Sequence, residues 1–170
     1  MDTLLPIKEL NEADFESFIK TVNTLFETAP PLAKRLYEKR PYSSYDALIN
    51  EADEIQSRLN EKERVEVINA HPRIGAPKQN LSAMSQREQG KGQEDNEVNE
   101  ELKRLNEAYE QKFGFKFIVF VNGRTRKEII PVLKERMEGQ SREQELNTGI
   151  QEMIMIARDR LKKLGQQSHL

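Results

Sequence analysis

The sequence contains no cysteine, which excludes disulfide bonds, thiolate catalysis and cysteine-based zinc sites. Only one of its two histidines, His71, lies outside the C-terminal tail, so paired histidine ligands at metal-binding spacing are missing too. No apolar run approaches the ~20 residues that a membrane-spanning helix needs, and the N-terminus lacks the charged and apolar regions of a signal peptide. We therefore expect no metal site, no membrane partner and no signal peptide.

The sequence also lacks a large excess of charge of either sign. The 27 basic and 29 acidic residues give a formal net charge of -2. No basic excess is available to neutralise a phosphate backbone, so we expect no nucleic-acid partner. Hydrophobic residues make up 36% of the 170 residues and recur periodically, which favours a folded helical domain over disorder. This length suits one domain, which we expect to cover residues 1–170.

Helical spacing of apolar residues accounts for most of the chain and predicts an all-α fold, a single-domain helical bundle of about eight helices. Local cap and stop residues mark where these helices begin and end. The expected helices are 11–26 with Asn11 as its N-cap, 32–40 after Pro30 and Pro31, one capped by Ser44 and ending at Leu59, one capped by Asn60 and ending near Ala70, 82–89, 94–113 stopped by Gly114, one that Thr125 caps and that contains Pro131, and 142–164.

One run, Phe115 to Val121, has the composition of a strand. The sequence offers it no second strand as a partner. We therefore predict a buried extended segment whose backbone groups must find other hydrogen-bond partners. Asn122-Gly123 is expected to turn the chain after it.

His71 is the first candidate for chemistry. It follows a predicted helix and precedes Pro72, and the residue before a proline is pushed out of the helical region. His71 should therefore sit at a defined bend. A histidine at the end of a helix is also a common charge-complementing cap, and the residues alone favour that interpretation.

A second candidate is the segment Ser85-Gln86-Arg87-Glu88-Gln89. On a helix, Ser85 lies three positions before Glu88 and four before Gln89, so the three side chains can share one face. A hydroxyl, a carboxylate and an amide would suit a polar, urea-like ligand. The alternative is a solvated helix.

The third candidate is an arginine in the last predicted helix. Arg160 lies beside the apolar stripe of that helix, whereas Arg158 lies farther round. An arginine at the border of a core must meet an acid, a carbonyl or an anionic ligand, because an unpaired buried charge is unfavourable. From the residues alone, a salt bridge to a neighbouring helix is the favoured interpretation.

Five blocks along the chain resemble the 2-oxo-4-hydroxy-4-carboxy-5-ureidoimidazoline (OHCU) decarboxylase family in order and spacing. The resemblance covers essentially the whole chain. The blocks are His71-Pro72-Arg73-Ile74-Gly75, Ser85-Gln86-Arg87-Glu88-Gln89, Leu105-Asn106-Glu107-Ala108-Tyr109 leading into Lys112-Phe113-Gly114-Phe115-Lys116-Phe117-Ile118-Val119, Gly123-Arg124-Thr125, and Ile156-Ala157-Arg158-Asp159-Arg160-Leu161.

The resemblance implies an all-helical fold, a homodimer, and no metal or organic cofactor. It implies that the substrate is OHCU, formed from urate by oxidation and ring hydrolysis, and that the products are CO2 and (S)-allantoin. It also implies residue roles, with His71 as the catalytic histidine and Glu88 as its partner carboxylate. Substrate would be contacted by Ser85, Gln89 and Arg160, with Arg158 as the alternative to Arg160. The backbones of Pro72, Phe117 and Val119 would add further contacts.

Two other functions remain open. A non-catalytic helical binding module would need an exposed apolar patch and would leave His71 solvated. A hydrolase acting on the hydroxyisourate precursor would need a group to position water, and the sequence has no histidine pair for that task.

The last three residues, Ser168-His169-Leu170, resemble the peroxisomal address Ser-Lys-Leu, with histidine in place of lysine. A polar tail without such a role is the alternative. We expect the peroxisome in a eukaryote and the cytoplasm otherwise.

Overall fold

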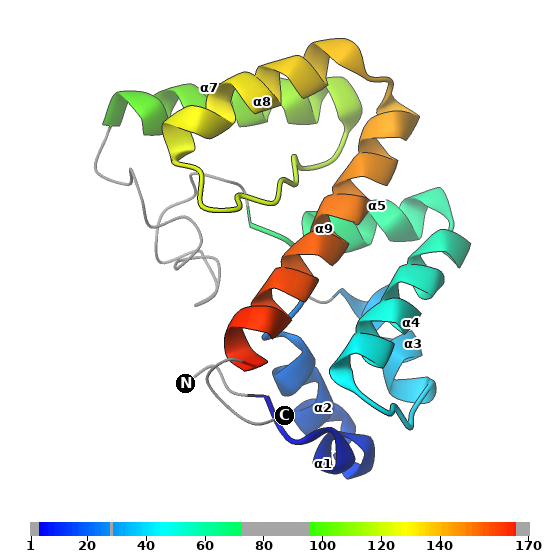
Figure 1. The fold of residues 1–170 in the computed structure, drawn as a ribbon. Coiled ribbons are helices and arrows are strands. Elements are labelled where there is room, and N and C mark those ends of the chain that lie inside the picture. Colours follow the sequence, from blue (N-terminus) through cyan, green and yellow to red (C-terminus); the bar gives the residue numbers. More distant parts are fainter. Residues whose placement is uncertain (1–3, 28, 73–95, 166–170) are drawn as a thin grey trace. The chain divides into compact units, whose positions relative to one another are not determined.

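The computed structural model describes residues 4–27, 29–72 and 96–165 (Figure 1). These residues form eight α-helices and no β-strand, which confirms the predicted all-α fold. The helices are α1 (Ile7–Glu12), α2 (Phe15–Val22), α3 (Pro30–Glu38), α4 (Tyr45–Arg58), α5 (Glu61–Asn69), α7 (Asn96–Phe113), α8 (Arg126–Gly139) and α9 (Arg142–Gly165). The predicted helix 82–89 and the tail Ser168-His169-Leu170 lie outside the described residues.

Contacts divide the chain into two compact units. The first consists of Met1–Ala70 with Met153–Leu170, and the second of His71–Glu152. The boundary falls within α9, so this helix contributes to both units. That the whole chain forms one domain stays a prediction.

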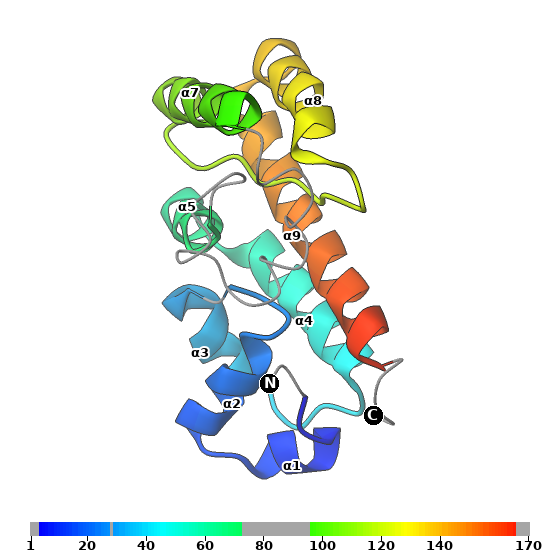
Figure 2. The ribbon, with the colours of Figure 1, turned by 90° about the vertical axis from the view of Figure 1, so that its left-hand side faces the viewer.

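The core of the first unit is built from α2, α3, α4 and the C-terminal part of α9. Figure 2 shows α4 running beside the orange-to-red end of α9. The Gln56 amide nitrogen donates to the Met153 sulfur at 3.6 Å, and Arg158 Nη2 donates to Asn50 Oδ1 at 2.8 Å, so hydrogen bonds link the two helices at two positions. Apolar side chains with no exposed surface fill the core: Phe18, Val22, Leu32, Leu36, Leu48, Ile49, Ala52 and Ala157.

Local caps start several helices where the sequence predicts them. Ser44 Oγ accepts from the Ala47 amide at 3.1 Å, and Asn60 Oδ1 accepts from the Glu63 amide at 2.8 Å. Thr125 forms a capping box at the start of α8. Each cap satisfies an amide that has no partner inside its helix, which is why these starts could be read locally.

The predicted helix 11–26 with Asn11 as its N-cap is wrong. The chain forms α1 and α2 instead, and the N-cap of α2 is Asp14, whose carboxylate accepts from the Ser17 amide at 2.8 Å. Asn11 lies inside α1, and its side chain pairs with both backbone groups of Tyr42, at 2.8 Å each. A partner 31 residues away therefore outweighs the local capping preference.

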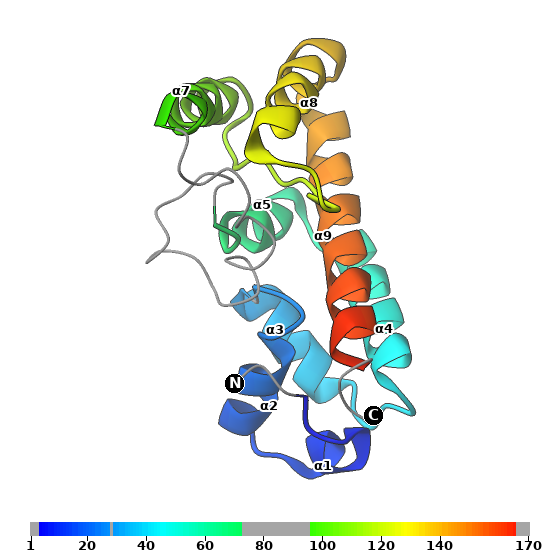
Figure 3. The ribbon, with the colours of Figure 1, turned by 60° about the vertical axis from the view of Figure 1, so that its left-hand side comes forward.

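In the second unit α7 and α8 pack side by side (Figures 1 and 3). Arg126 Nη1 donates to Asn99 Oδ1 at 2.8 Å across this contact. The chain leaves α7 at Gly114 and turns into α8 at Asn122-Gly123, and all three residues have positive φ, of 84°, 50° and 77°. Both predicted breaks are therefore confirmed.

Between these breaks lies the predicted extended segment, residues 115–121. It has neither helical nor strand structure, and five of its side chains are buried, those of Phe115, Phe117, Ile118, Val119 and Val121. Phe115 and Phe117 pack against the ring of Tyr109 on α7, with centroid separations of 6.1 and 5.3 Å.

Candidate functional site

His71 follows the end of α5 and is buried, with 4% of its surface exposed. Its carbonyl accepts a hydrogen bond from Lys116 Nζ at 3.1 Å. Lys116 belongs to the extended segment, and Pro72, next to His71, is half-buried. The structure therefore brings together two features that the sequence singles out separately, the bend at His71 and the extended segment. A binding module would leave this histidine solvated, which the burial of His71 contradicts.

One edge of the extended segment is held by side chains. Arg136 Nη1 donates to the Ile118 carbonyl at 2.6 Å. The Phe120 amide donates to Glu152 Oε1 at 3.0 Å, and the Phe120 carbonyl accepts from Arg124 Nη2 at 2.6 Å. These side chains replace the neighbouring strand that the segment lacks.

The other edge of the segment presents the backbone groups of Phe117 and Val119. In an extended chain the amides and carbonyls of alternate residues point to opposite sides. Because Ile118 and Phe120 point toward Arg136 and Glu152, Phe117 and Val119 point away from them. Within the described part of the chain, the backbones of Phe117 and Val119 make no hydrogen bond. This edge can therefore bind the donors and acceptors of a small polar ligand.

A buried network stands behind the bonded edge. Glu145, which has no exposed surface, pairs with Arg136, with Oε1 at 2.8 Å from Nη2 and 3.0 Å from Nε. Tyr109 donates its hydroxyl proton to the same carboxylate. The Arg136 guanidinium also lies over the ring of Phe117, 4.5 Å from its centroid. Burial, together with the Glu145 carboxylate, raises the pKa of Tyr109, so its phenol stays protonated and remains a donor.

This network is not predicted from the sequence, although one signal in the sequence points to it. Glu145 and Glu152 are seven residues apart on α9, two helical turns, so they lie on the same face of the helix. Both carboxylates serve the extended segment, Glu152 directly and Glu145 through Arg136.

Arg160 belongs to the first unit and is buried, with 1% of its surface exposed. Its Nη1 donates to the Leu25 carbonyl at 3.3 Å, and its Nη2 pairs with Glu27 Oε1 at 3.4 Å. A salt bridge is therefore present, as the residues alone favoured, but its partner Glu27 lies in the loop between α2 and α3 and not on a neighbouring helix. Arg158 is exposed and bonds to Asn50. Of the two candidate arginines, only Arg160 has the buried setting in which a charged contact is strong.

Three of the predicted site residues, Ser85, Glu88 and Gln89, lie outside the described residues. Their roles stay predictions, as do those of His71, Pro72, Phe117, Val119 and Arg160, whose positions the structure gives.

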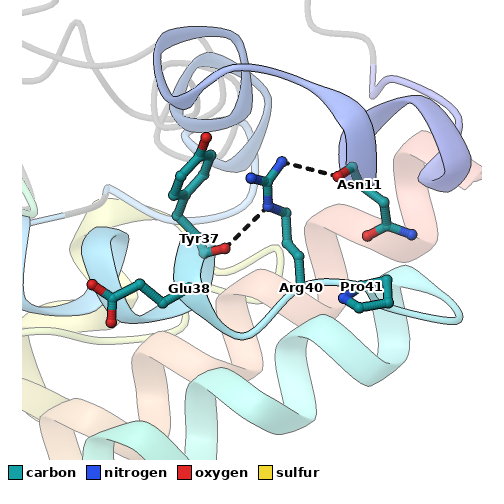
Figure 4. Close-up of a pocket in the computed structure, with 5 residues that line it drawn as sticks. All are labelled: Asn11, Tyr37, Glu38, Arg40 and Pro41. Carbon is teal, nitrogen blue, oxygen red and sulfur yellow. Dashed lines mark hydrogen bonds between the residues drawn. The ribbon is translucent and has the colours of Figure 1, made fainter.

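An open hollow of about 380 Å3 lies in the first unit, where the described lining residues are Asn11, Tyr37, Glu38, Arg40 and Pro41 (Figure 4). Arg40 Nε donates to the Tyr37 carbonyl at 3.0 Å, and its Nη1 donates to the Asn11 and Ala13 carbonyls at 3.0 and 2.7 Å. The guanidinium thus bonds to backbone groups, so we assign this hollow to the contact between α1 and the residues after α3, and not to substrate.

Within the described ranges, no group of three or more histidine, cysteine, aspartate or glutamate side chains is placed to hold a metal ion. In the same ranges, none of the helices combines the length and the apolar character that crossing a membrane requires.

Comparison with known proteins gives a consistent result. The family model described as OHCU decarboxylase matches residues 11–162. The chain is 32% identical over 165 residues to the 2-oxo-4-hydroxy-4-carboxy-5-ureidoimidazoline decarboxylase of Halalkalicoccus jeotgali, covering 95% of this chain and 93% of that protein. It is 31% identical over 164 residues to the uric acid degradation bifunctional protein of Bacillus sp. (strain TB-90), covering 95% of this chain but 32% of that protein. The chain therefore spans about a third of the length of this bifunctional relative.

Solved structures include a similar fold. The crystal structure of OHCU decarboxylase in the presence of (S)-allantoin matches with a TM-score of 0.70 and 26% sequence identity. The match covers 90% of this chain and 99% of that chain.

Proposed function

Because this chain belongs to the OHCU decarboxylase family, we propose that it converts OHCU to (S)-allantoin and CO2, a step of urate breakdown. The structural observation that carries the proposal is the meeting of a buried histidine with an extended segment. The carbonyl of His71 accepts from Nζ of Lys116, the residue that precedes Phe117 in the segment where Phe117 and Val119 offer backbone groups.

The substrate itself contains the group that accepts the electron pair released by decarboxylation. The bond between C4 and the carboxylate breaks, and its electron pair moves into the ring toward the adjacent imine nitrogen. That nitrogen takes up a proton, which leaves an enol at C4 and C5. A second proton then adds at C5 while the 4-hydroxyl loses its proton and becomes the carbonyl of allantoin, and the proton at C5 sets the configuration of the product. Because the ring stores the electron pair, the proposed reaction requires no cofactor. The protein has to orient the ring, place charge and deliver the proton to one face.

The proposed roles follow from side-chain chemistry. An imidazole ordinarily titrates close to neutrality, so His71 can transfer a proton in either direction. Glu88 would fix the tautomer of that imidazole, as carboxylates do in other dyads. Ser85 and Gln89 would bond to the ureido group. The backbones of Pro72, Phe117 and Val119 would bind the edge of the ring.

Arg160 would hold a substrate carboxylate or ureido oxygen in its planar fork. Its contacts with Leu25 and Glu27, at 3.3 and 3.4 Å, are longer than the ~2.7–2.9 Å typical of a charge-assisted bond.

Arg160→Lys tests this role, because lysine keeps the charge but loses the fork. We expect KM for OHCU to rise by about tenfold, equivalent to ~1.4 kcal/mol of binding, with unchanged helix content by circular dichroism. The matched control is Arg158→Lys, an exposed arginine on the same helix, which should leave KM unchanged. A raised KM in the control alone would move the role to Arg158.

The function itself is tested with freshly prepared OHCU. The chain should accelerate the loss of ultraviolet absorbance, and the allantoin formed should be optically active, because a protein-bound ring is protonated on one face. An uncatalysed rate with racemic product would reject decarboxylation. Consumption of hydroxyisourate without effect on OHCU would support the hydrolase alternative instead.

A homodimer is also part of the proposal, and it rests on the family resemblance. Light scattering of the purified 19.8 kDa chain should give twice that mass in solution. A monomeric mass at assay concentration would reject it.

A further inference from the structure

The side chains that hold the bonded edge of the extended segment differ in their surroundings. Arg124 and Glu152 are half-buried, whereas the Arg136 side chain is only 9% exposed. Arg136 bonds to Ile118, the residue between Phe117 and Val119. A shift of the Ile118 carbonyl therefore displaces the backbone groups on both sides of it.

We propose that Arg136, locked in place by Glu145 and Tyr109, is a positioning residue that fixes the extended segment so that the Phe117 and Val119 backbones meet the substrate. This inference rests on the proposed function. Arg136 touches no substrate in it, and it acts through the carbonyl of Ile118.

The contacts of Arg136 argue for positioning over stabilisation. Replacing a buried ion pair by uncharged residues of similar volume is often neutral for stability, so stability alone gives little reason for this pair. Arg136 uses its fork in two directions at once, with Nε and Nη2 on Glu145 and Nη1 on Ile118. Glu145 and Tyr109 thereby fix the direction in which Nη1 points. Binding groups must be held to within ~0.5 Å of the productive geometry, and such a locked fork achieves this.

Arg136→Lys separates the two roles of this side chain. A lysine can still pair with Glu145, but a single ammonium group on a flexible stem cannot reproduce the fork that reaches Ile118. We expect KM for OHCU to rise by about tenfold with kcat changed less, because the backbone contacts bind substrate and transition state alike.

The matched control is Arg35→Lys. Arg35 also pairs with a glutamate, Glu63, at 3.1 Å and donates to a backbone carbonyl, that of Pro31, at 2.9 Å. It lies exposed on α3, in the first unit. We expect its KM and kcat to match those of the wild type. Equal kinetic changes in both variants would overturn the inference.

A double variant keeps the test valid if a single change destabilises the fold. Arg136→Met with Glu145→Gln removes both charges together and leaves an acceptor for the Tyr109 hydroxyl. We expect a melting temperature close to that of the wild type but the same rise in KM. A wild-type KM in this folded variant would overturn the inference.

Amide hydrogen exchange supplies a measurement that needs no turnover. In Arg136→Lys the Phe120 amide, which the wild-type segment holds against Glu152 Oε1, should exchange faster, while the amides of α7 keep their wild-type rates. Unchanged exchange in the segment would overturn the inference. Failure of the wild-type chain to convert OHCU would instead reject the proposed function, so the two failures are distinguishable.

Discussion

Replacing His71 with alanine is expected to lower kcat by about 10²-fold or more, the usual contribution of a positioned general acid or base. In the proposed reaction the imidazole delivers the proton that creates the stereocentre of allantoin. Without the imidazole, water must donate the proton, so the product should also lose optical purity. Steady-state kinetics combined with the optical activity of the product measure both effects.

The burial of His71 requires a stability measurement beside the kinetics. The side chain is 4% exposed, so alanine leaves a cavity and lowers the melting temperature. His71→Gln fills more of that space but cannot transfer the proton, and it should lose as much activity with a smaller loss of stability. Glu66→Ala, at an exposed position of α5, should change neither. Activity that falls only as far as the folded fraction would return His71 to the role of a helix cap.

Helix starts are the part of this fold that the sequence predicts best, because their causes are local. Ser44, Asn60 and Thr125 each bond to an amide three residues ahead, so composition and spacing suffice to find them. Asn11 has the same cap chemistry, yet it bonds to Tyr42. That contact depends on where α3 ends and on how the chain returns, which no local pattern contains.

In the extended segment, too, local features can be predicted from the sequence but long-range contacts cannot. Its ends at Gly114 and Asn122-Gly123 and its apolar composition are visible in the sequence, and the structure confirms them. Two of its hydrogen-bond partners are not visible, because they lie 18 residues away at Arg136 and 32 residues away at Glu152. A chain in which 33% of residues are charged gives little reason to single out two of them.

Among the site residues, sequence reasoning worked where helical phase or backbone restriction applied. Arg160 was placed beside the apolar stripe of its helix and Arg158 farther round, and the structure buries the first and exposes the second. The pre-proline position of His71 indicated a bend after α5, where the structure places it. Its contact with Lys116 joins residues 45 positions apart, so only the fold could show it.

Glu145→Ala is expected to cause the largest loss of stability. It leaves the Arg136 guanidinium buried without its carboxylate, and breaking a buried pair in this way costs about 3–5 kcal/mol. Arg136 keeps its bond to Ile118 and its contact with the Phe117 ring, so we expect the lower end of that range. For a chain of this size, ~3 kcal/mol corresponds to a melting temperature lowered by roughly 6–12 °C. Differential scanning calorimetry measures it.

A surface pair provides the control for that value. Glu54 and Arg58 also form an ion pair, at 3.6 Å, but both side chains are mostly exposed. Solvent screens such a pair, so Glu54→Ala should cost at most about 1 kcal/mol. In contrast, adding Arg136→Met to Glu145→Ala should restore part of the lost stability, because no buried charge then remains unpaired. If the double variant were less stable than Glu145→Ala, the remaining contacts of Arg136 would outweigh its unpaired charge, and the ion pair would not be the source of the loss.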